Sequence, residues 1–129
     1  MKATHPKNTR HRGKSGENAV CRFLFWRGYR ILERNFTVKG GEIDIIATRF
    51  RYIVFVEVKT RSAATDTEKY GHAADAVTEE KKIHLRHAAS RYLALHPSKK
   101  KPRFDVAEVY LPQEDQTGIP HIRYIKEAF

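Results

Sequence analysis

Two acids and a lysine in neighbouring segments of the chain are able to do chemistry together. Residues 40–61 read GGEIDIIATRFRYIVFVEVKTR. Because side chains alternate between the two faces of a strand, Asp44 shares a face with Glu42, and Glu57 shares a face with Lys59. If a tight turn joins the two strands, Asp44 falls opposite Glu57. The spacing therefore predicts two carboxylates and an ammonium on one patch of a sheet.

These three groups have the chemistry that phosphodiester hydrolysis needs. Two carboxylates suit a hard divalent cation such as Mg²⁺, which prefers oxygen ligands and keeps several waters. The bound metal would lower the pKa of a water molecule and neutralise charge on the scissile phosphate. The Lys59 ammonium would add positive charge for the attacking water or for the oxygens that become negative in the transition state. We therefore expect Asp44 and Glu57 to be metal ligands and Lys59 to be a catalytic cation.

A purely structural explanation of the same residues is an edge strand with one wet face. On such a strand Glu57 and Lys59 would only face solvent. The preceding run, Ile53-Val54-Phe55-Val56, favours burial on both faces instead. Burying charges costs several kcal/mol per ion unless they are paired or bind a metal. Charges that follow a buried run, at the strand end where α/β sheets place their sites, therefore favour a functional site.

The elements around this segment predict an α/β fold, a mixed sheet flanked by helices in the core order αβββαβ. Ser15 is a candidate cap for a helix that runs to about Arg27 and ends at Gly28. This helix places Glu17 on its apolar face. The other expected elements are strands at residues 29–37, 42–48, 52–60, 104–110 and 121–126, and a helix from Asp75 or Thr78 to about His96. The first three strands are joined too closely for crossovers and should be antiparallel, whereas the long helix should cross over to a parallel strand.

The length of the chain limits the number of domains, and its net charge indicates the kind of partner. The chain has 129 residues, which fits one domain with one core, and a formal net charge of +10, which favours a polyanionic partner. We expect residues 1–13 to be a flexible basic arm and residues 14–129 to be a single nuclease-like domain. The single cysteine cannot form an internal disulfide, no apolar run could span a bilayer, and the basic start lacks the apolar core of a secretory signal. A cytoplasmic protein with no membrane partner is the natural expectation.

Several basic residues are candidates for contacts with nucleic acid, although each cluster could equally be a solvated surface. One cluster lies near the N-terminus, one lies in the basic loop before the fourth strand, and single residues follow the Glu57 strand and begin the second helix. At the start of that helix, either Lys81 or Lys82 is a candidate to face the site. The candidates are Arg10, Arg12, Lys14, Arg61, Lys81, Lys99, Lys100 and Lys101. His84 and His87 are spaced for one helix face, but a zinc site would need further ligands, so we reject it. We expect Asp105 to be structural and to pair with a core arginine.

The full string of motifs resembles a known group. Asp44, twelve intervening residues and then Glu57-Val58-Lys59 are similar to the signature of the PD-(D/E)xK superfamily, which includes restriction endonucleases and Holliday-junction resolvases. The chain is closer still to the YraN family of uncharacterised bacterial endonuclease-like proteins. That resemblance runs through Gly16-Glu17, residues 28–32, Arg34-Asn35, residues 40–44, residues 54–61 and residues 103–106. Ile43 stands where the superfamily name has proline, a difference that resolvase-like members share.

The resemblance implies a resolvase-like fold and a Mg²⁺ site, with Mn²⁺ as a candidate substitute. It implies that Glu17 joins Asp44 and Glu57 as a metal ligand and, with Lys59, as a catalytic residue. The function that we expect is an endonuclease hydrolysing DNA, with branched or structured DNA among the candidate substrates. One alternative is a nucleic-acid-binding accessory protein that does not cleave, and another is a ribosome- or RNA-associated basic protein. A homodimer is a candidate assembly of this protein, because a DNA junction has two strands to cut.

Overall fold

The chain forms two helices and a five-stranded sheet in the part that the structure describes. A computed structural model describes the backbone of residues 4–62, 77–112 and 118–129, and their side chains apart from those of 4–12 and 62. The elements are α1 (Thr4–Trp26), β1 (Arg30–Val38), β2 (Gly41–Arg49), β3 (Tyr52–Ser62), α3 (Glu79–Leu95), β4 (Lys101–Leu111) and β5 (His121–Ile125). This order confirms the expected α/β class and the order αβββαβ with a last strand.

The strands follow one another across the sheet in the order β1-β2-β3-β4-β5. The pairs β1–β2 and β2–β3 are antiparallel, β3 and β4 are parallel, and β5 returns antiparallel to β4. The parallel pair is the one that α3 connects, as the crossover rule requires. The hairpin between β1 and β2 turns through Gly40, whose φ of +92° favours a residue without a side chain.

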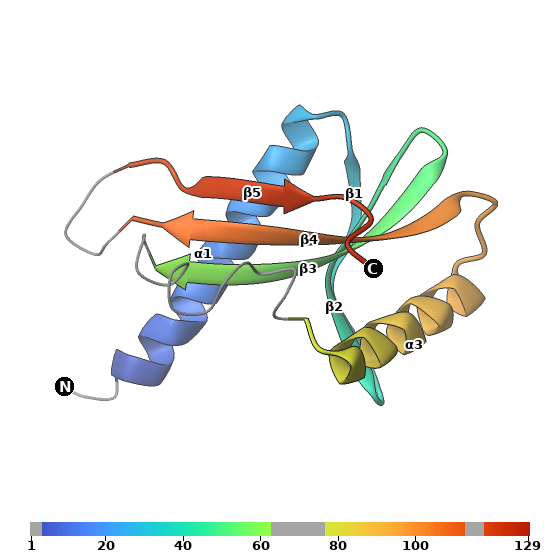
Figure 1. The fold of residues 1–129 in the computed structure, drawn as a ribbon, viewed down its shortest axis with the longest axis horizontal. Coiled ribbons are helices and arrows are strands. Elements are labelled where there is room, and N and C mark those ends of the chain that lie inside the picture. The colour runs from blue at the N-terminus through green and yellow to red at the C-terminus, as the bar shows by residue number, and fades with distance from the viewer. Residues whose placement is uncertain (1–3, 63–76, 113–117) are drawn as a thin grey trace.

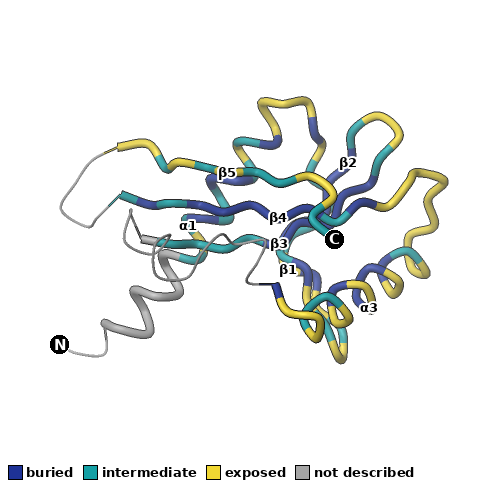
Figure 2. Tube along the Cα trace, in the orientation of Figure 1, coloured by how far each residue is buried: buried dark blue, intermediate teal, exposed yellow. Residues whose placement is uncertain are grey.

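The two helices cover opposite faces of the sheet (Figure 1; Figure 2). Val20 and Leu24 of α1 pack on Ile45, Val54 and other residues of one face. Leu85, Ala88, Ala89 and Tyr92 of α3 pack on the other face, around Phe55 and Ile46. The central strand β3 is therefore buried on both sides, which rules out the alternative of an edge strand with a wet face for Glu57.

Two expected boundaries were wrong. Helix α1 begins at Thr4 and not at Ser15, so the backbone of residues 4–13 continues the helix. Pro6 does not prevent this because it falls in the first turn, where its missing N–H has no intrahelical partner. Strand β4 begins at Lys101, whose N–H donates to the carbonyl of Arg51 at 2.8 Å. The separation of an arm from a domain stays a prediction.

Of the two candidate starts for the second long helix, the structure has the one after Thr78. The Thr78 hydroxyl accepts a hydrogen bond from the N–H of Lys81, as an N-cap does. Among the residues that the structure describes, no helix is long and apolar enough to cross a bilayer.

Candidate active site

The two acids of the predicted patch meet where β2 separates from β3. The ladder between these strands ends at the pair Ile45–Val56, and one further step of the same register would bring Asp44 opposite Glu57. At that point the Asp44 Oδ2 atom accepts a hydrogen bond from the N–H of Val58 at 2.8 Å. The Asp44 carboxylate therefore replaces a ladder carbonyl and is fixed in the gap between the strands.

Glu57 is a buried carboxylate held by two ammonium groups. Its side chain is only 6% exposed, and its Oε2 atom lies 3.4 Å from Lys59 Nζ and 3.5 Å from Lys81 Nζ. Lys59 comes from the same strand, while Lys81 comes from the first turn of α3, which the Thr78 cap fixes. Of the candidates on α3, the structure thus brings Lys81 to the site. Lys82 instead pairs with Glu79 at 3.0 Å.

The electrostatics of the gap disfavour a negative charge on Asp44. Burial and then the neighbouring Glu57 charge raise the pKa of Asp44 from its ordinary 3.8 to about 7. The charges of Glu17 and Glu42 add to this shift, while the Val58 N–H opposes it. An Asp44 carboxyl with a pKa this high would gain from a cation beside its oxygens, because a nearby positive charge favours the ionised form.

Glu17 lies within electrostatic reach of this pair but has a partner of its own. Its Oε1 atom is 3.5 Å from Arg34 Nη2 of β1. Helix α1 comes close to β3 here because Gly16 has no side chain, and a Cβ atom at this position would overlap the Thr60 hydroxyl. The structure therefore places Glu17 beside the site, and its role as a third metal ligand stays a prediction.

The donor set fits a hard divalent cation. Asp44 and Glu57 offer carboxylate oxygens, which Mg²⁺ takes from one or two side chains and completes with waters and substrate phosphates. Within residues 13–61, 77–112 and 118–129, no group of three or more His, Cys, Asp or Glu side chains forms a ready cage. His87 Nε2 lies 3.2 Å from the Lys39 carbonyl oxygen, and the rejection of a zinc site stays a prediction.

The candidate nucleic-acid contacts do not all gather at this site. Lys81 is part of it, Arg61 lies two residues after Lys59 on β3, and Lys14 is exposed on α1 before Glu17. The exposed cluster Lys99, Lys100 and Lys101 lies at the other end of β3, because Lys101 pairs with Tyr52. That is about 16 Å along the strand from Glu57 at the usual rise per residue. The side chains of Arg10 and Arg12 lie outside the described residues.

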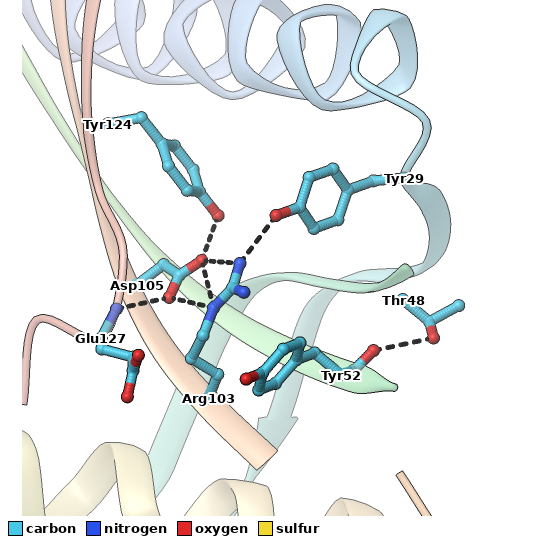
Figure 3. Close-up of polar contacts among 7 residues, drawn as sticks. All are labelled: Tyr29, Thr48, Tyr52, Arg103, Asp105, Tyr124 and Glu127. Atoms are coloured by element: carbon cyan, nitrogen blue, oxygen red, sulfur yellow. Dashed lines mark hydrogen bonds and ion pairs between the residues drawn. The ribbon is translucent and has the colours of Figure 1, made fainter. Parts of the chain in front are cut away.

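Sequence reasoning missed one acid on the same face of the sheet. Glu108 is fully buried in β4, pairs in register with Lys59, and lies 3.5 Å from Arg123 Nη1. A charged residue inside the apolar run Val106-Ala107-Glu108-Val109 was the available signal. The expected partner of Asp105 is confirmed, because Arg103 Nη2 lies 2.8 Å from Asp105 Oδ2 in the buried network of Figure 3.

Fold and site together define the class of protein. A mixed sheet in the order αβββαβ, with Glu57 midway along its central strand and Asp44 beside it on β2, is a resolvase-like α/β domain. Residues 16–109 match the uncharacterised protein family UPF0102, so the chain belongs to this family, the YraN family expected from the sequence.

Similar proteins are found in several bacteria. A UPF0102 protein of Caldicellulosiruptor bescii is 40% identical over 95% of this chain and 99% of its own length. One from Symbiobacterium thermophilum is 43% identical over 94% of this chain and 98% of its own length. Another, from Chlorobium phaeobacteroides, is 45% identical over 75% of each chain.

Proposed function

We propose that this protein is a Mg²⁺-dependent endonuclease that hydrolyses phosphodiester bonds of DNA in the cytoplasm. One observation carries the proposal: a buried Glu57 with two lysine ammoniums at 3.4 and 3.5 Å stands beside Asp44, in the gap between two strands. A folding requirement alone would favour apolar residues there, since ionised groups are costly to bury. The formal net charge of +10 favours the polyanionic substrate that this chemistry would act on.

Each side chain has a separate part in this proposal. Asp44 and Glu57 would hold the metal, which when bound polarises a phosphate and activates a water. The Val58 N–H keeps Asp44 aimed into the gap. Lys59 and Lys81 offset the repulsion between the acids before the metal binds. When phosphate is present, Lys59 can stabilise the negative charge of the transition state.

Cleavage assays with matched variants test the proposal. Pure protein is incubated with end-labelled duplex, single-stranded and four-way DNA in Mg²⁺, Mn²⁺ or EDTA. We expect the parent to cut at least one substrate with metal and none in EDTA. Asp44→Asn should abolish cleavage without weakening DNA binding, because it removes a negative charge. Glu42→Gln is the matched control, since this neighbouring acid of β2 is exposed, and it should cut like the parent.

Two results would overturn the proposal. If Asp44→Asn cuts like the parent, the activity belongs to another site or to a contaminant. If the parent binds DNA tightly but cuts no substrate with either metal, the accessory-protein alternative holds.

A further inference from the structure

A second feature of the molecule lies at the opposite end of α1 from its basic start. A cavity of about 540 Å³ opens between the last turn of α1 and the starts and ends of three strands. Its size falls in the range of small-molecule and nucleotide sites. Its lining is aromatic and cationic: Phe23, Trp26, Arg27, Tyr29, Arg49, Tyr124 and Lys126. None of these described lining residues is acidic, so the cavity favours an anionic ligand.

Hydrogen bonds and ring stacking fix the aromatic side chains that line this cavity. The Tyr29 hydroxyl accepts a hydrogen bond from Arg103 at 2.7 Å, and the Tyr124 hydroxyl donates to Asp105 at 2.6 Å. Figure 3 shows both hydroxyls pointing toward the buried Arg103–Asp105 pair. The Phe23 ring stacks on Tyr124 with 5.5 Å between centroids. Rings fixed in this way lose little freedom when a flat ligand stacks on them, which favours binding.

The cations of the cavity are already arranged over aromatic rings. The Arg27 guanidinium lies 3.7 Å from the centroid of Phe23, and that of Arg49 lies 5.5 Å from the centroid of Tyr29. Guanidinium planes bind phosphate and also stack on flat groups. Planar stacking surfaces interleaved with cations are what proteins use to bind unpaired nucleotides.

Trp26 is the most exposed part of this surface. The residue is 79% exposed, although tryptophan is usually highly buried. It also lines a neighbouring hollow of about 340 Å³, together with Arg27 and Arg22. Trp26 and Arg27 therefore stand between two adjoining hollows. A nucleic-acid strand with one nucleotide in the first hollow could continue into the second.

We propose that this cavity binds an unpaired nucleotide of a DNA strand, whose base stacks on Trp26 while Arg27, Arg49 and Lys126 pair with its phosphates. This deepens the proposed function, on which the choice of DNA rests, by naming a substrate class with an unpaired segment next to the cleaved strand. From Trp26 to Glu17 along α1 is about 14 Å. A DNA strand that leaves the cavity along α1 would reach Glu17, the acid beside the site, in about four nucleotides at a stacked spacing of about 3.4 Å.

The chain offers a direct probe, because Trp26 is its only tryptophan. The full-length protein is titrated in EDTA with oligothymidylate, with a duplex carrying a single-stranded overhang, and with a blunt duplex. We expect saturable quenching of tryptophan fluorescence by the first two and little by the blunt duplex. Quenching should persist in Asp44→Asn, because the cavity does not use that carboxylate.

Variants measured by anisotropy of labelled overhang DNA separate stacking from charge. Trp26→Ala should weaken binding by about 5- to 150-fold, the loss expected for one base–aromatic stack, and Trp26→Phe should keep most of the affinity. Lys126→Gln should lower the slope of log K against log salt by about 0.7. Leu95→Ala, which removes an exposed apolar side chain of α3 outside the cavity, is the control and should bind like the parent.

The outcomes are distinct from those of the cleavage assay. Quenching with no cleavage by the parent would support the cavity and overturn the nuclease proposal. Equal quenching by blunt and overhang DNA, or Trp26→Ala binding like the parent, would overturn the cavity even if the parent cuts DNA. Competition by free deoxyadenosine monophosphate as strong as that by the oligonucleotide would assign the cavity to free nucleotides and overturn its role in strand binding.

Discussion

The raised pKa of Asp44 makes a prediction about folding stability that needs no substrate. In the unfolded chain this carboxyl ionises with its ordinary pKa of 3.8, whereas in the folded protein it ionises at about 7. The folded state therefore binds the proton more tightly, and the free energy of unfolding is highest below the unfolded pKa. It falls as the pH rises toward the folded pKa, because folding must then bury the ionised form.

The size of the effect follows from that difference. Each pH unit between the two pKa values is worth about 1.4 kcal/mol, and about two such units lie between pH 5 and pH 7. The parent should therefore lose about 2–3 kcal/mol between about pH 5 and pH 8 from this one group. Asp44→Asn has no such proton, and its amide oxygen can still accept the Val58 N–H. Between about pH 5 and pH 8, the free energy of unfolding of Asp44→Asn relative to that of the parent should therefore rise by about 2–3 kcal/mol.

Urea unfolding followed by circular dichroism measures this difference. Parent and Asp44→Asn are compared at about pH 5 and pH 8 in EDTA, so that the histidine titrations common to both cancel in the difference. If the two proteins lose stability in parallel, Asp44 does not stand beside Glu57 in a buried gap, and the site described above is wrong.

Adding Mg²⁺ extends the same experiment. At 100 times its dissociation constant, a ligand that binds only the folded state adds about 2.7 kcal/mol of stability. The parent should gain this at pH 8 and Asp44→Asn should not. An equal gain in both would mean that Mg²⁺ binds elsewhere.

The remaining predictions concern rate, packing and the buried network. Lys59→Ala should keep Mg²⁺ binding but lose about 10²–10³ in cleavage rate, measured by single-turnover kinetics; an unchanged rate would remove it from the site. Gly16→Ala should destabilise the fold and reduce cleavage, because the added methyl group overlaps Thr60, whereas Gly13→Ala, with nothing within 4 Å, should be neutral or stabilising in thermal unfolding. Asp105→Ala should cost about 3–5 kcal/mol in urea unfolding, since it leaves a buried arginine without its carboxylate; a loss below about 1 kcal/mol would contradict that role.

Local sequence determined the strands that carry the site. Apolar alternation and the tight turn between β2 and β3 fix which residues face each other, so the proximity of Asp44 and Glu57 was predictable from spacing. Gly28 likewise ends α1 by adopting a φ of +88°, a conformation that glycine accepts without strain. These features depend on residues close in the chain, whose geometry the backbone rules set directly.

Tertiary packing decided which residues from distant segments of the chain reach the site. Lys81 reaches Glu57 only because α3 crosses from β3 to β4 and begins at Thr78, and the sequence left open which helical lysine would face the site. The basic cluster at residues 99–101 was a candidate for the same substrate, yet it lies at the far end of β3. Helix rotation and the start of a parallel strand depend on contacts between distant segments, which periodicity does not encode.

The aromatic and cationic cavity is the clearest example of an arrangement that sequence patterns do not predict. Its lining residues come from the end of α1, the segment before β1, the end of β2, and β5 with the residue after it. In the sequence Trp26, Arg49 and Lys126 have no common motif. They meet because α1 lies across one face of the sheet and the twist of the sheet brings both of its edges beneath the end of the helix, an arrangement that only the packed structure specifies.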